Sequence, residues 1–539
     1  MDDGFPLALA RLGASVVRRP WRALPAAAEL TANLFAAGAR TAAVALGQPS
    51  PPVVAPAAKD RRFADPAWTK SPWFYGTAQA YLSGAKFLRE VAERQGDEKA
   101  QFAAGALVDA LAPTNFLPTN PAALRKAYET RGESLKNGFK NLVSDVVTNG
   151  GRPQQVDPTA FEVGRDLAVT PGHVVFRNHL MELIQYVPQT ATVHETPLLM
   201  SPPWINKYYI MDLAPGRSLV EWAVQHGHTV FTLSYRNPDE SMRTVTLDDY
   251  LLLGLNAAVD AVREITGAED VNVAGLCVGG TLAVMLHAYL AQQAKGGIRS
   301  LTLLNTLVDF SEPGALGAFT DRAAVERLEE RMAEQGFVDE VEMATTFDFL
   351  RANDLIWNYV ASGWLMGEPA PAFDILAWNA DATRISEATH SFYLRSFYLE
   401  NQLSRGTLEM AGTPIDLDLA EADTYVLAAV EDHITPWKSS YKTTGLLPTK
   451  MKFVLSSSGH IAGVVNPPSP KRHYWTNDDL PEDPDEWLAD ATQHTGSWWG
   501  DWTAWIADRA GPQRPPPPLG SAIHSPIATA PGTYVRRGS

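Results

Sequence analysis

The feature that most constrains the fold is a sharp apolar turn within residues 271–290, which read VNVAGLCVGGTLAVMLHAYL. The first six residues have the composition of a buried strand, and those after Cys277 have the composition of a helix. Glycines at positions 275 and 279 flank Cys277 on either side, where a strained turn leaves no room for side chains. We therefore expect a strand–turn–helix unit that presents Cys277, the single cysteine of the chain, as a nucleophile.

Strands alternate with helices over the part of the chain after residue 165. Short runs of strand-forming residues occur at 173–176, 196–202, 229–235, 271–276, 300–305, 424–430 and 452–457. Helical patterns separate most of these runs, and one example is LDDYLLLGLNAAVDAVREI after the third run. This alternation predicts an α/β fold with a mainly parallel sheet and helices on both faces.

Changes in composition along the chain predict its domain organisation. Residues 1–60 form a variable segment that ends in a Pro-rich linker, and residues 61–165 have the apolar spacing of a helical domain. Residues 166–510 carry the α/β pattern, interrupted at about 310–415 by helical and aromatic residues that we interpret as a cap over the carboxyl edge of the sheet. Residues 511–539 are a Pro-rich tail, expected to be extended or disordered.

Composition and charge exclude several classes of function. The net charge of −16 argues against a general nucleic-acid binder, which needs a basic surface. A single cysteine forms no internal disulfide, which fits a reducing compartment. The sequence has no signal-peptide pattern, no apolar run long enough for a membrane span, no metal-ligand spacing and no Gly-rich phosphate loop. We therefore expect a soluble cytoplasmic protein without a metal or other bound cofactor.

A cysteine nucleophile needs a base, and the base needs an acid that orients it. In a fold of this kind the acid and the histidine follow the nucleophile in that order, each after a late strand. The segment EDHITPW places Asp432 after the sixth predicted strand, and GHIAG places His460 after the seventh. Two alternatives stay open, with Glu431 as the acid or His433 as the base.

Negative charge that develops on a carbonyl oxygen under attack requires two backbone donors. One is the N–H of Val278, the residue after the nucleophile. The other is expected from the loop after an early strand, which reads SPPWINKYY. Trp204 follows two prolines that have no N–H and stiffen the turn, so its N–H is the second predicted donor of this oxyanion hole.

The presence of cysteine instead of serine at the turn indicates the kind of substrate. Attack of a thiol on a thioester exchanges one thioester for another at almost no cost in free energy, so the acyl group stays activated. A later attack by an alcohol then forms an oxygen ester in a downhill step, provided that the cap excludes water. The sequence therefore favours acyl transfer from a thioester over plain ester hydrolysis.

Many segments of the chain resemble motifs of the polyhydroxyalkanoate synthases. They extend from about residue 61 to about residue 510 and include DRRFADPAW, FEVGRDLAVTPGHVVFRN, PPWINKYYIMDL, GHTVFTLSYRNPDESM, GLCVGGT, RANDLIWNYV, FDILAWNADATRI, EDHITPW and GHIAGVVNPP. The resemblance implies a helical N-terminal domain followed by an α/β-hydrolase catalytic domain with a cap. It also implies polymerisation of (R)-3-hydroxyacyl-CoA into polyester with release of CoA, at the surface of cytoplasmic storage granules and commonly as a homodimer.

The resemblance also implies roles for individual residues. Cys277 matches the acylated nucleophile, and His460 matches the base that activates it. Asp432 matches the acid, which either orients His460 or helps to deprotonate the 3-hydroxyl of the incoming unit. His433 matches the histidine after that acid and is expected to contact substrate. Coenzyme A enters as part of the thioester substrate, so no cofactor is implied. The segments GHIAGVVNPP and CVGG make the chain more similar to the single-subunit class for short-chain (C3–C5) units, such as 3-hydroxybutyrate, than to the medium-chain class, which resembles this chain less because it has serine where Val278 stands.

Two other functions fit part of the pattern. A cysteine hydrolase of the dienelactone-hydrolase kind shares the G-x-C-x-G turn and the acid–histidine order, but such chains are much shorter and lack the cap and the helical N-terminal domain. The second is a catalytically silent protein of the granule coat. The intact set of Cys277, Asp432 and His460 argues against it.

Overall fold

The computed structural model describes residues 4–58, 60–95 and 98–536. The chain divides into two compact units. The first comprises Met1–Asp157 and Thr345–Ala372, and the second comprises Pro158–Ala344 and Phe373–Ser539. The second unit is thus interrupted in sequence by a piece of the first, and that piece falls within the predicted cap insertion.

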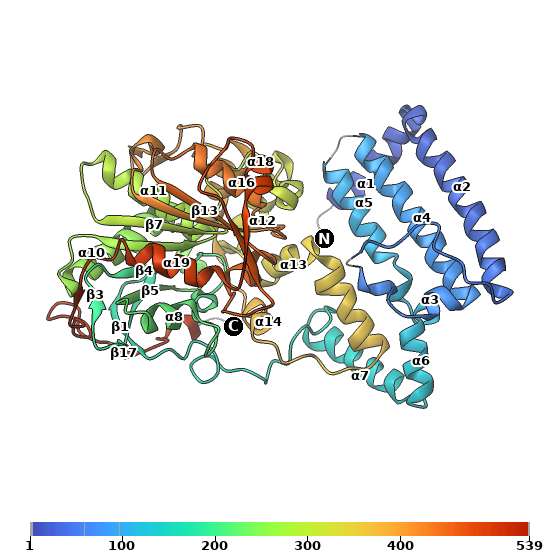
Figure 1. Cartoon of the computed structure of the whole chain (residues 1–539), viewed down its shortest axis with the longest axis horizontal. Coiled ribbons are helices and arrows are strands. Elements are labelled where there is room, and N and C mark those ends of the chain that lie inside the picture. The colour runs from blue at the N-terminus through green and yellow to red at the C-terminus, as the bar shows by residue number, and fades with distance from the viewer. Residues whose placement is uncertain (1–3, 59, 96–97, 537–539) are drawn as a thin grey trace. The chain divides into compact units, whose positions relative to one another are not determined.

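The second unit is built on one large sheet (Figure 1). This sheet has eleven strands in the order β15-β14-β13-β12-β7-β6-β4-β5-β2-β1-β17. The strands are β1 (Gly172–Arg177), β2 (Met181–Tyr186), β4 (Leu198–Ser201), β5 (Val230–Tyr235), β6 (Val271–Leu276), β7 (Ile298–Leu304), β12 (Asp423–Ala429), β13 (Met451–Ser456), β14 (His473–Thr476), β15 (Thr492–Thr495) and β17 (Ala528–Thr529). All seven predicted strands are confirmed. The predicted parallel pairing holds for the six central strands, from β13 to β5, whereas both ends of the sheet are antiparallel.

Four strands that the sequence analysis missed, β2, β14, β15 and β17, belong to these antiparallel ends. In β2 the polar side chain of Glu182 is fully buried, because its carboxylate accepts hydrogen bonds from the backbone N–H groups of Thr533 and Tyr534, each at 2.9 Å. The tail that carries these two residues also pairs with β1 through β17. Over its described residues the Pro-rich tail is therefore extended and anchored, not disordered.

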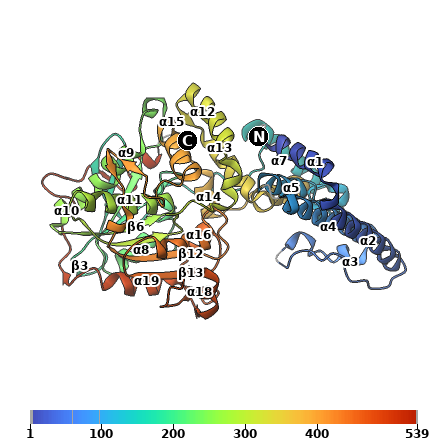
Figure 2. The ribbon, with the colours of Figure 1, turned by 90° about the horizontal axis from the view of Figure 1, so that it is seen from above.

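Helices cover both faces of the sheet, as predicted. Figure 2 shows α11 and α19 on opposite sides of it. The main covering helices are α10 (Ala257–Thr266) and α11 (Val278–Gln292) on one face and α8 (Leu219–Gln225) and α19 (Trp498–Ala507) on the other. Neighbouring residues of a strand point to opposite faces, so Val273 and Ala274 belong to separate apolar clusters. Because both faces are covered, the carboxyl edge of the parallel strands is the place where loops can build a site.

Further helices and short strands of the second unit connect or follow the central strands. The helices are α9 (Leu247–Asp249), the π-helical η6 (Tyr250–Asn256), α12 (Arg322–Gln335), α14 (Asp374–Ala380), α15 (Glu387–Tyr393), the π-helical η10 (Leu394–Leu399), α16 (Trp437–Tyr441), α17 (His460–Val464) and α18 (Pro484–Asp490). The short strands pair as β3 (Val193–His194) with β16 (Gln513–Arg514), β8 (Phe337–Val338) with β9 (Ile385–Ser386), and β10 (Glu409–Met410) with β11 (Thr413–Pro414).

The first unit is helical, as the sequence predicted for residues 61–165, and it also contains helices from the predicted variable segment 1–60 and from the predicted cap. Its helices are α1 (Gly4–Arg18), α2 (Pro20–Ala45), α3 (Ala67–Lys70), α4 (Pro72–Gln95), α5 (Glu98–Ala110), α6 (Pro121–Glu129), α7 (Glu133–Thr148) and the π-helical η8 (Asn353–Trp357) and η9 (Val360–Leu365), with α13 (Glu340–Leu350) at the boundary between units. Helices α2 and α4 lie side by side (Figures 1 and 2). Alanines such as Ala26, Ala92 and Ala104 form a small core, which lets the helices approach closely. No helix in the described ranges combines the length and apolar character needed to span a bilayer.

The inserted residues 345–372 are tied into the first unit by polar contacts with α7. The side-chain amide of Asn141 donates to the carbonyl oxygens of Gly363 at 3.0 Å and Glu368 at 3.1 Å. The indole N–H of Trp364 donates to Asp145 at 2.7 Å. At Gly138 the two backbones touch, because a Cβ there would lie 1.9 Å from the carbonyl oxygen of Trp364.

Gly138→Ala is expected to destabilise the first unit by roughly 2–3 kcal/mol, because the added methyl group forces α7 and η9 apart. Hydrogen exchange of the α7 amides, followed by mass spectrometry, should show the loss of protection. Gly105→Ala in α5 is the matched control, because a Cβ at Gly105 meets nothing within 4 Å. Equal protection of α7 in the two variants would contradict the close contact.

Candidate active site

Cys277 lies at the turn between β6 and α11, as predicted. Its φ of 53° is in the left-handed region, which is strained for any residue other than glycine. A Cβ at Gly275 would lie 2.4 Å from the Cα of Gly280, and one at Gly279 would lie 2.2 Å from the carbonyl oxygen of Ser201. The backbone N–H of Cys277 donates to the carbonyl oxygen of Leu304 at 2.8 Å. Close packing against neighbouring backbone therefore requires the glycines and fixes the direction of the thiol.

His460 and Asp432 meet at the carboxyl edge of the sheet. Asp432 follows β12, and His460 begins the short helix α17 after β13. Nδ1 of His460 lies 2.7 Å from Oδ2 of Asp432, and both residues are buried. The charge of Cys277 also acts on His460. The structure thus brings together the three residues that the sequence analysis selected.

Ionised Asp432 is held by a network of donors. The backbone N–H groups of Ile434 and Thr435 donate to its Oδ1 at 2.8 and 2.9 Å, and the hydroxyl of Thr435 donates to its Oδ2 at 2.7 Å. Burial raises the pKa of Asp432, but the charge and hydrogen bond of His460, together with the bonds from Thr435, outweigh burial and lower the pKa. The carboxylate is therefore charged at neutral pH and available to His460.

Burial lowers the pKa of His460, but the charges of Asp432 and Cys277 and the hydrogen bond to Asp432 raise it to about 10. A histidine whose pKa is raised in this way is a strong base beside the Cys277 thiol. The arrangement can therefore generate a sulfur nucleophile at the end of β6.

The raised pKa of His460 predicts how stability depends on pH. Its contribution is fully present below 6.5, the ordinary pKa of histidine, and is lost as the pH rises towards about 10. We expect the melting temperature of the wild type to fall towards that of His460→Gln between pH 7 and pH 10, as measured by calorimetry. If the melting temperatures of the two proteins differed by the same amount at every pH in this range, the prediction would be wrong.

The two predicted oxyanion donors lie on either side of the turn. Val278 is the first residue of α11, and Trp204 belongs to the loop after β4, which contacts the turn at Gly279. Among the described residues, neither backbone N–H has a hydrogen-bond acceptor. The indole of Trp204 is 2% exposed and packs against Tyr393 with ring centroids 5.6 Å apart. Both N–H groups therefore lack an acceptor within the described residues, as an oxyanion hole requires.

The two alternatives that the sequence left open differ in their surroundings. Glu431 is exposed, whereas the neighbouring Asp432 is buried against His460. His433 is half-buried in the turn that follows Asp432, and its carbonyl oxygen faces Gly314. Asp432 and His460, not Glu431 and His433, form the buried hydrogen-bonded pair.

An aromatic wall beside Cys277 was missed by the sequence analysis. The hydroxyl groups of Tyr393 and Tyr398 lie 3.4 Å apart, and Phe310 packs edge-on against both rings. Burial raises the pKa of each tyrosine, and the charge of Cys277 raises it further. The repeat in SFYLRSFYLEN was the available signal, but its five-residue period does not match the 3.6-residue period of an α-helix, and Leu394–Leu399 is π-helical. The wall places buried aromatic rings close enough to Cys277 for its charge to act on both tyrosines.

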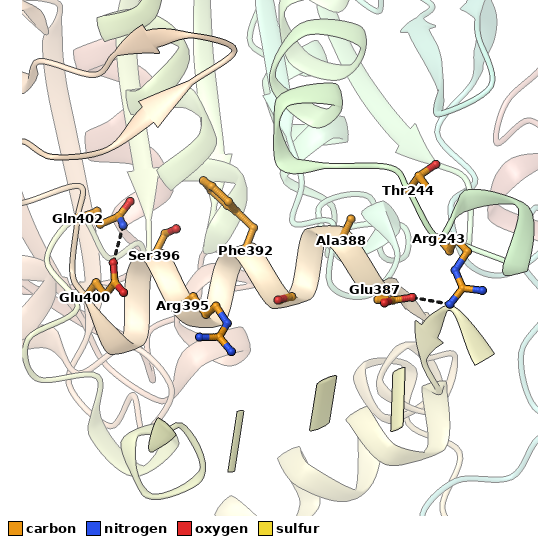
Figure 3. A pocket seen from close by; sticks show the side chains of 10 residues that line it. Arg243, Thr244, Glu387, Ala388, Phe392, Arg395, Ser396, Glu400 and Gln402 are labelled. Atoms are coloured by element: carbon orange, nitrogen blue, oxygen red, sulfur yellow. Dashed lines mark hydrogen bonds and ion pairs between the residues drawn. The ribbon is translucent and has the colours of Figure 1, made fainter. Parts of the chain in front are cut away.

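A hollow of about 670 Å³ lies on a different face of the same helical segment, α15 and η10 (Figure 3). Its lining includes Arg243 and Arg395, which could in principle receive a phosphate. Arg243 instead pairs with Glu387 at 2.8 Å, and Arg395 pairs with Glu329 at 2.6 Å. Because these cations are already neutralised, the hollow is a poor site for a strongly anionic group.

Parallel central strands covered by helices, with a nucleophile turn after β6, are the features of the α/β-hydrolase fold. Residues 207–467 match a family model described as "alpha/beta hydrolase fold". The second unit therefore has this fold, as the sequence predicted.

Residues 59–223 match the model described as "Poly-beta-hydroxybutyrate polymerase (PhaC) N-terminus". The chain is 46% identical over 490 residues to the poly(3-hydroxyalkanoate) polymerase subunit PhaC of Cupriavidus necator, covering 88% of this chain and 83% of that one. It is 43% identical over 545 residues to the poly(3-hydroxyalkanoate) polymerase of Methylorubrum extorquens, and this match covers 99% of this chain and 90% of that one. It is 41% identical over 500 residues to poly(3-hydroxyalkanoate) polymerase 1 of Ectopseudomonas oleovorans, and this match covers 91% of this chain and 88% of that one. The chain belongs to the poly(3-hydroxyalkanoate) polymerases and is an acyltransferase.

Proposed function

We propose that the chain polymerises (R)-3-hydroxyacyl-CoA into polyester, releases CoA and carries the growing chain on Cys277. The observation that supports this most is the buried, hydrogen-bonded His460–Asp432 pair, with the charge of Cys277 acting on His460, at the edge of an α/β-hydrolase sheet in a member of the polymerase family. A short-chain substrate such as 3-hydroxybutyryl-CoA is proposed from the valine at position 278.

In the first step, Nε2 of His460 takes the proton of the Cys277 thiol, and the sulfur attacks the thioester carbonyl. The N–H groups of Val278 and Trp204 stabilise the oxyanion. The carbon–sulfur bond to CoA then breaks, and the CoA thiolate takes the proton from His460. Asp432, held by Thr435, keeps Nδ1 of His460 oriented and stabilises its positive charge.

In the second step, a hydroxyl group attacks the acyl-Cys277 thioester. Its proton passes to His460, or first to Asp432 if that residue serves the substrate hydroxyl directly, and the Cys277 sulfur leaves and is reprotonated. An ester bond forms while a thioester bond breaks, so this step is downhill. His433, in the turn after Asp432, is proposed to contact the incoming substrate. The steps use only groups of the chain and substrate, so we expect no cofactor and full activity after treatment with a chelator.

The proposed product is apolar and insoluble, so the enzyme is proposed to work at the surface of cytoplasmic polyester granules and as a homodimer. Exposed apolar side chains in the first unit are compatible with such a surface. On α2 the side chain of Phe35 is 81% exposed, and on α7 those of Phe139 and Val147 are 67% and 76% exposed.

The proposal is tested with radiolabelled (R)-3-hydroxybutyryl-CoA and purified protein. We expect CoA release in step with insoluble labelled polymer, and label on the peptide that contains Cys277 after rapid acid quenching. Cys277→Ala should release no CoA, form no polymer and carry no label on that peptide. Free 3-hydroxybutyrate in place of polymer would indicate a hydrolase, and wild-type protein without CoA release would indicate a silent coat protein.

A further inference from the structure

A third polar side chain contacts both members of the buried His460–Asp432 pair. The side chain of Thr435 is buried, and its Oγ1 lies 2.7 Å from Oδ2 of Asp432 and 3.2 Å from Nδ1 of His460. The third neighbour of Oγ1 is the carbonyl oxygen of Asn305, also at 3.2 Å. Thr435 therefore has contacts with the acid, with the histidine and with the loop after β7.

The single hydroxyl proton of Thr435 is best placed on Asp432. This contact is shorter than the one to Asn305, and hydrogen bonds to a charged acceptor are the stronger ones. With its proton directed at Asp432, Oγ1 presents a lone pair to Nδ1 of His460. The Nδ1–H group then has two acceptors, Oδ2 of Asp432 and Oγ1 of Thr435, so the proton of a neutral imidazole is held on Nδ1. Nε2 is thereby left as the acceptor for a proton from Cys277.

The backbone around Asn305 holds this arrangement in place. Asn305 has a φ of 45°, and its side-chain amide donates to the carbonyl oxygen of His460. The residues on either side contact the nucleophile, since Leu304 accepts the N–H of Cys277 at 2.8 Å and the hydroxyl of Thr306 donates to the carbonyl oxygen of Cys277 at 3.1 Å. One short segment therefore links the nucleophile, the histidine and Thr435.

From these contacts we propose that Thr435 is a positioning residue for acyl transfer, whose hydroxyl orders Asp432 and fixes the proton of His460 on Nδ1. This rests on the proposed function of Cys277 and His460. Thr435 does not touch the reacting atoms, and it acts through the imidazole. The effect of its removal should therefore appear in kcat and not in substrate binding.

Thr435→Val tests the proposal, because valine keeps the branched shape and the backbone N–H but lacks the hydroxyl. We expect kcat for CoA release to fall roughly 10- to 100-fold with KM changed less than about twofold. The acid limb of the kcat profile should move to higher pH, because the pKa of Asp432 rises when the Thr435 hydrogen bond is lost. Thr435→Ser restores the hydroxyl and should return kcat to within about threefold of the wild type.

Thr424→Val is the matched control for the loss of a buried hydroxyl. Thr424 lies near the other end of β12, and its side chain donates to the carbonyl oxygen of Ala422 at 2.8 Å. This variant should lose stability without a change in kcat or in the pH profile. Equal loss of activity in Thr435→Val and Thr435→Ser would indicate a packing role and overturn the inference.

The experiment also separates this inference from the proposed function. Wild-type kcat and pH profile in Thr435→Val, with Cys277→Ala inactive, would overturn the role of Thr435 and leave the proposed function standing. Absence of label on Cys277 in the wild-type protein would instead remove the proposed function, and the role of Thr435 with it.

Discussion

Cys277→Ser is expected to reduce CoA release by a factor on the order of 10³ or more while the protein stays folded. Two physical causes combine. A hydroxyl is much harder to deprotonate than a thiol, and the resulting oxygen ester discards the activation that a thioester retains for the next attack. Rapid-quench measurement of the first turnover, with the melting temperature as the check on folding, gives the result.

The Cys277→Ala variant gives the background rate of CoA release for this comparison, because it has no nucleophile at position 277. If the serine variant elongated polymer at a rate close to that of the wild type, sulfur would have no special role at this turn. The explanation of the single cysteine by thioester exchange would then be wrong.

His460→Gln is expected to have the second large effect, a loss on the order of 10³-fold or more in the first release of CoA. Glutamine fills a similar space and can still bond Asp432, but it cannot take the proton of Cys277. Single-turnover measurement of CoA release isolates this step from elongation.

Asp432→Asn distinguishes the two roles of the acid. If Asp432 mainly orients His460, the variant should fail at the first CoA release, as His460→Gln does. If it mainly serves the hydroxyl of the incoming unit, label should accumulate on Cys277 without growth of polymer. Normal release and normal elongation together would contradict both roles.

Much of the candidate site could be predicted, because the residues that shape it are close in sequence or are brought together by the order of the strands. The turn at Cys277 follows from Gly275 and Gly279, whose missing side chains make room for neighbouring backbone. Asp432 and His460 could be paired because the ends of adjacent parallel strands meet at one edge of the sheet. Neither inference needs knowledge of distant contacts.

The features that were missed depend on residues far apart in sequence. Thr435 looks like an ordinary turn residue until the ends of β7 and β12 lie side by side and bring Asn305 against it. Glu182 looks like a surface residue, but the returning tail supplies the N–H groups that allow its burial. Short polar strands at the sheet ends likewise carry no apolar alternation that could reveal them.

The interruption of the second unit by Thr345–Ala372 has a consequence for biosynthesis. A nascent chain leaves the ribosome from its N-terminus, and α7 emerges long before η9, the segment that packs on Gly138. The first unit is complete only after β1 to β7 have also been translated, so the folding of the two units overlaps during synthesis. A truncated chain that starts at Pro158 would leave η9 without α7, the helix on which it packs.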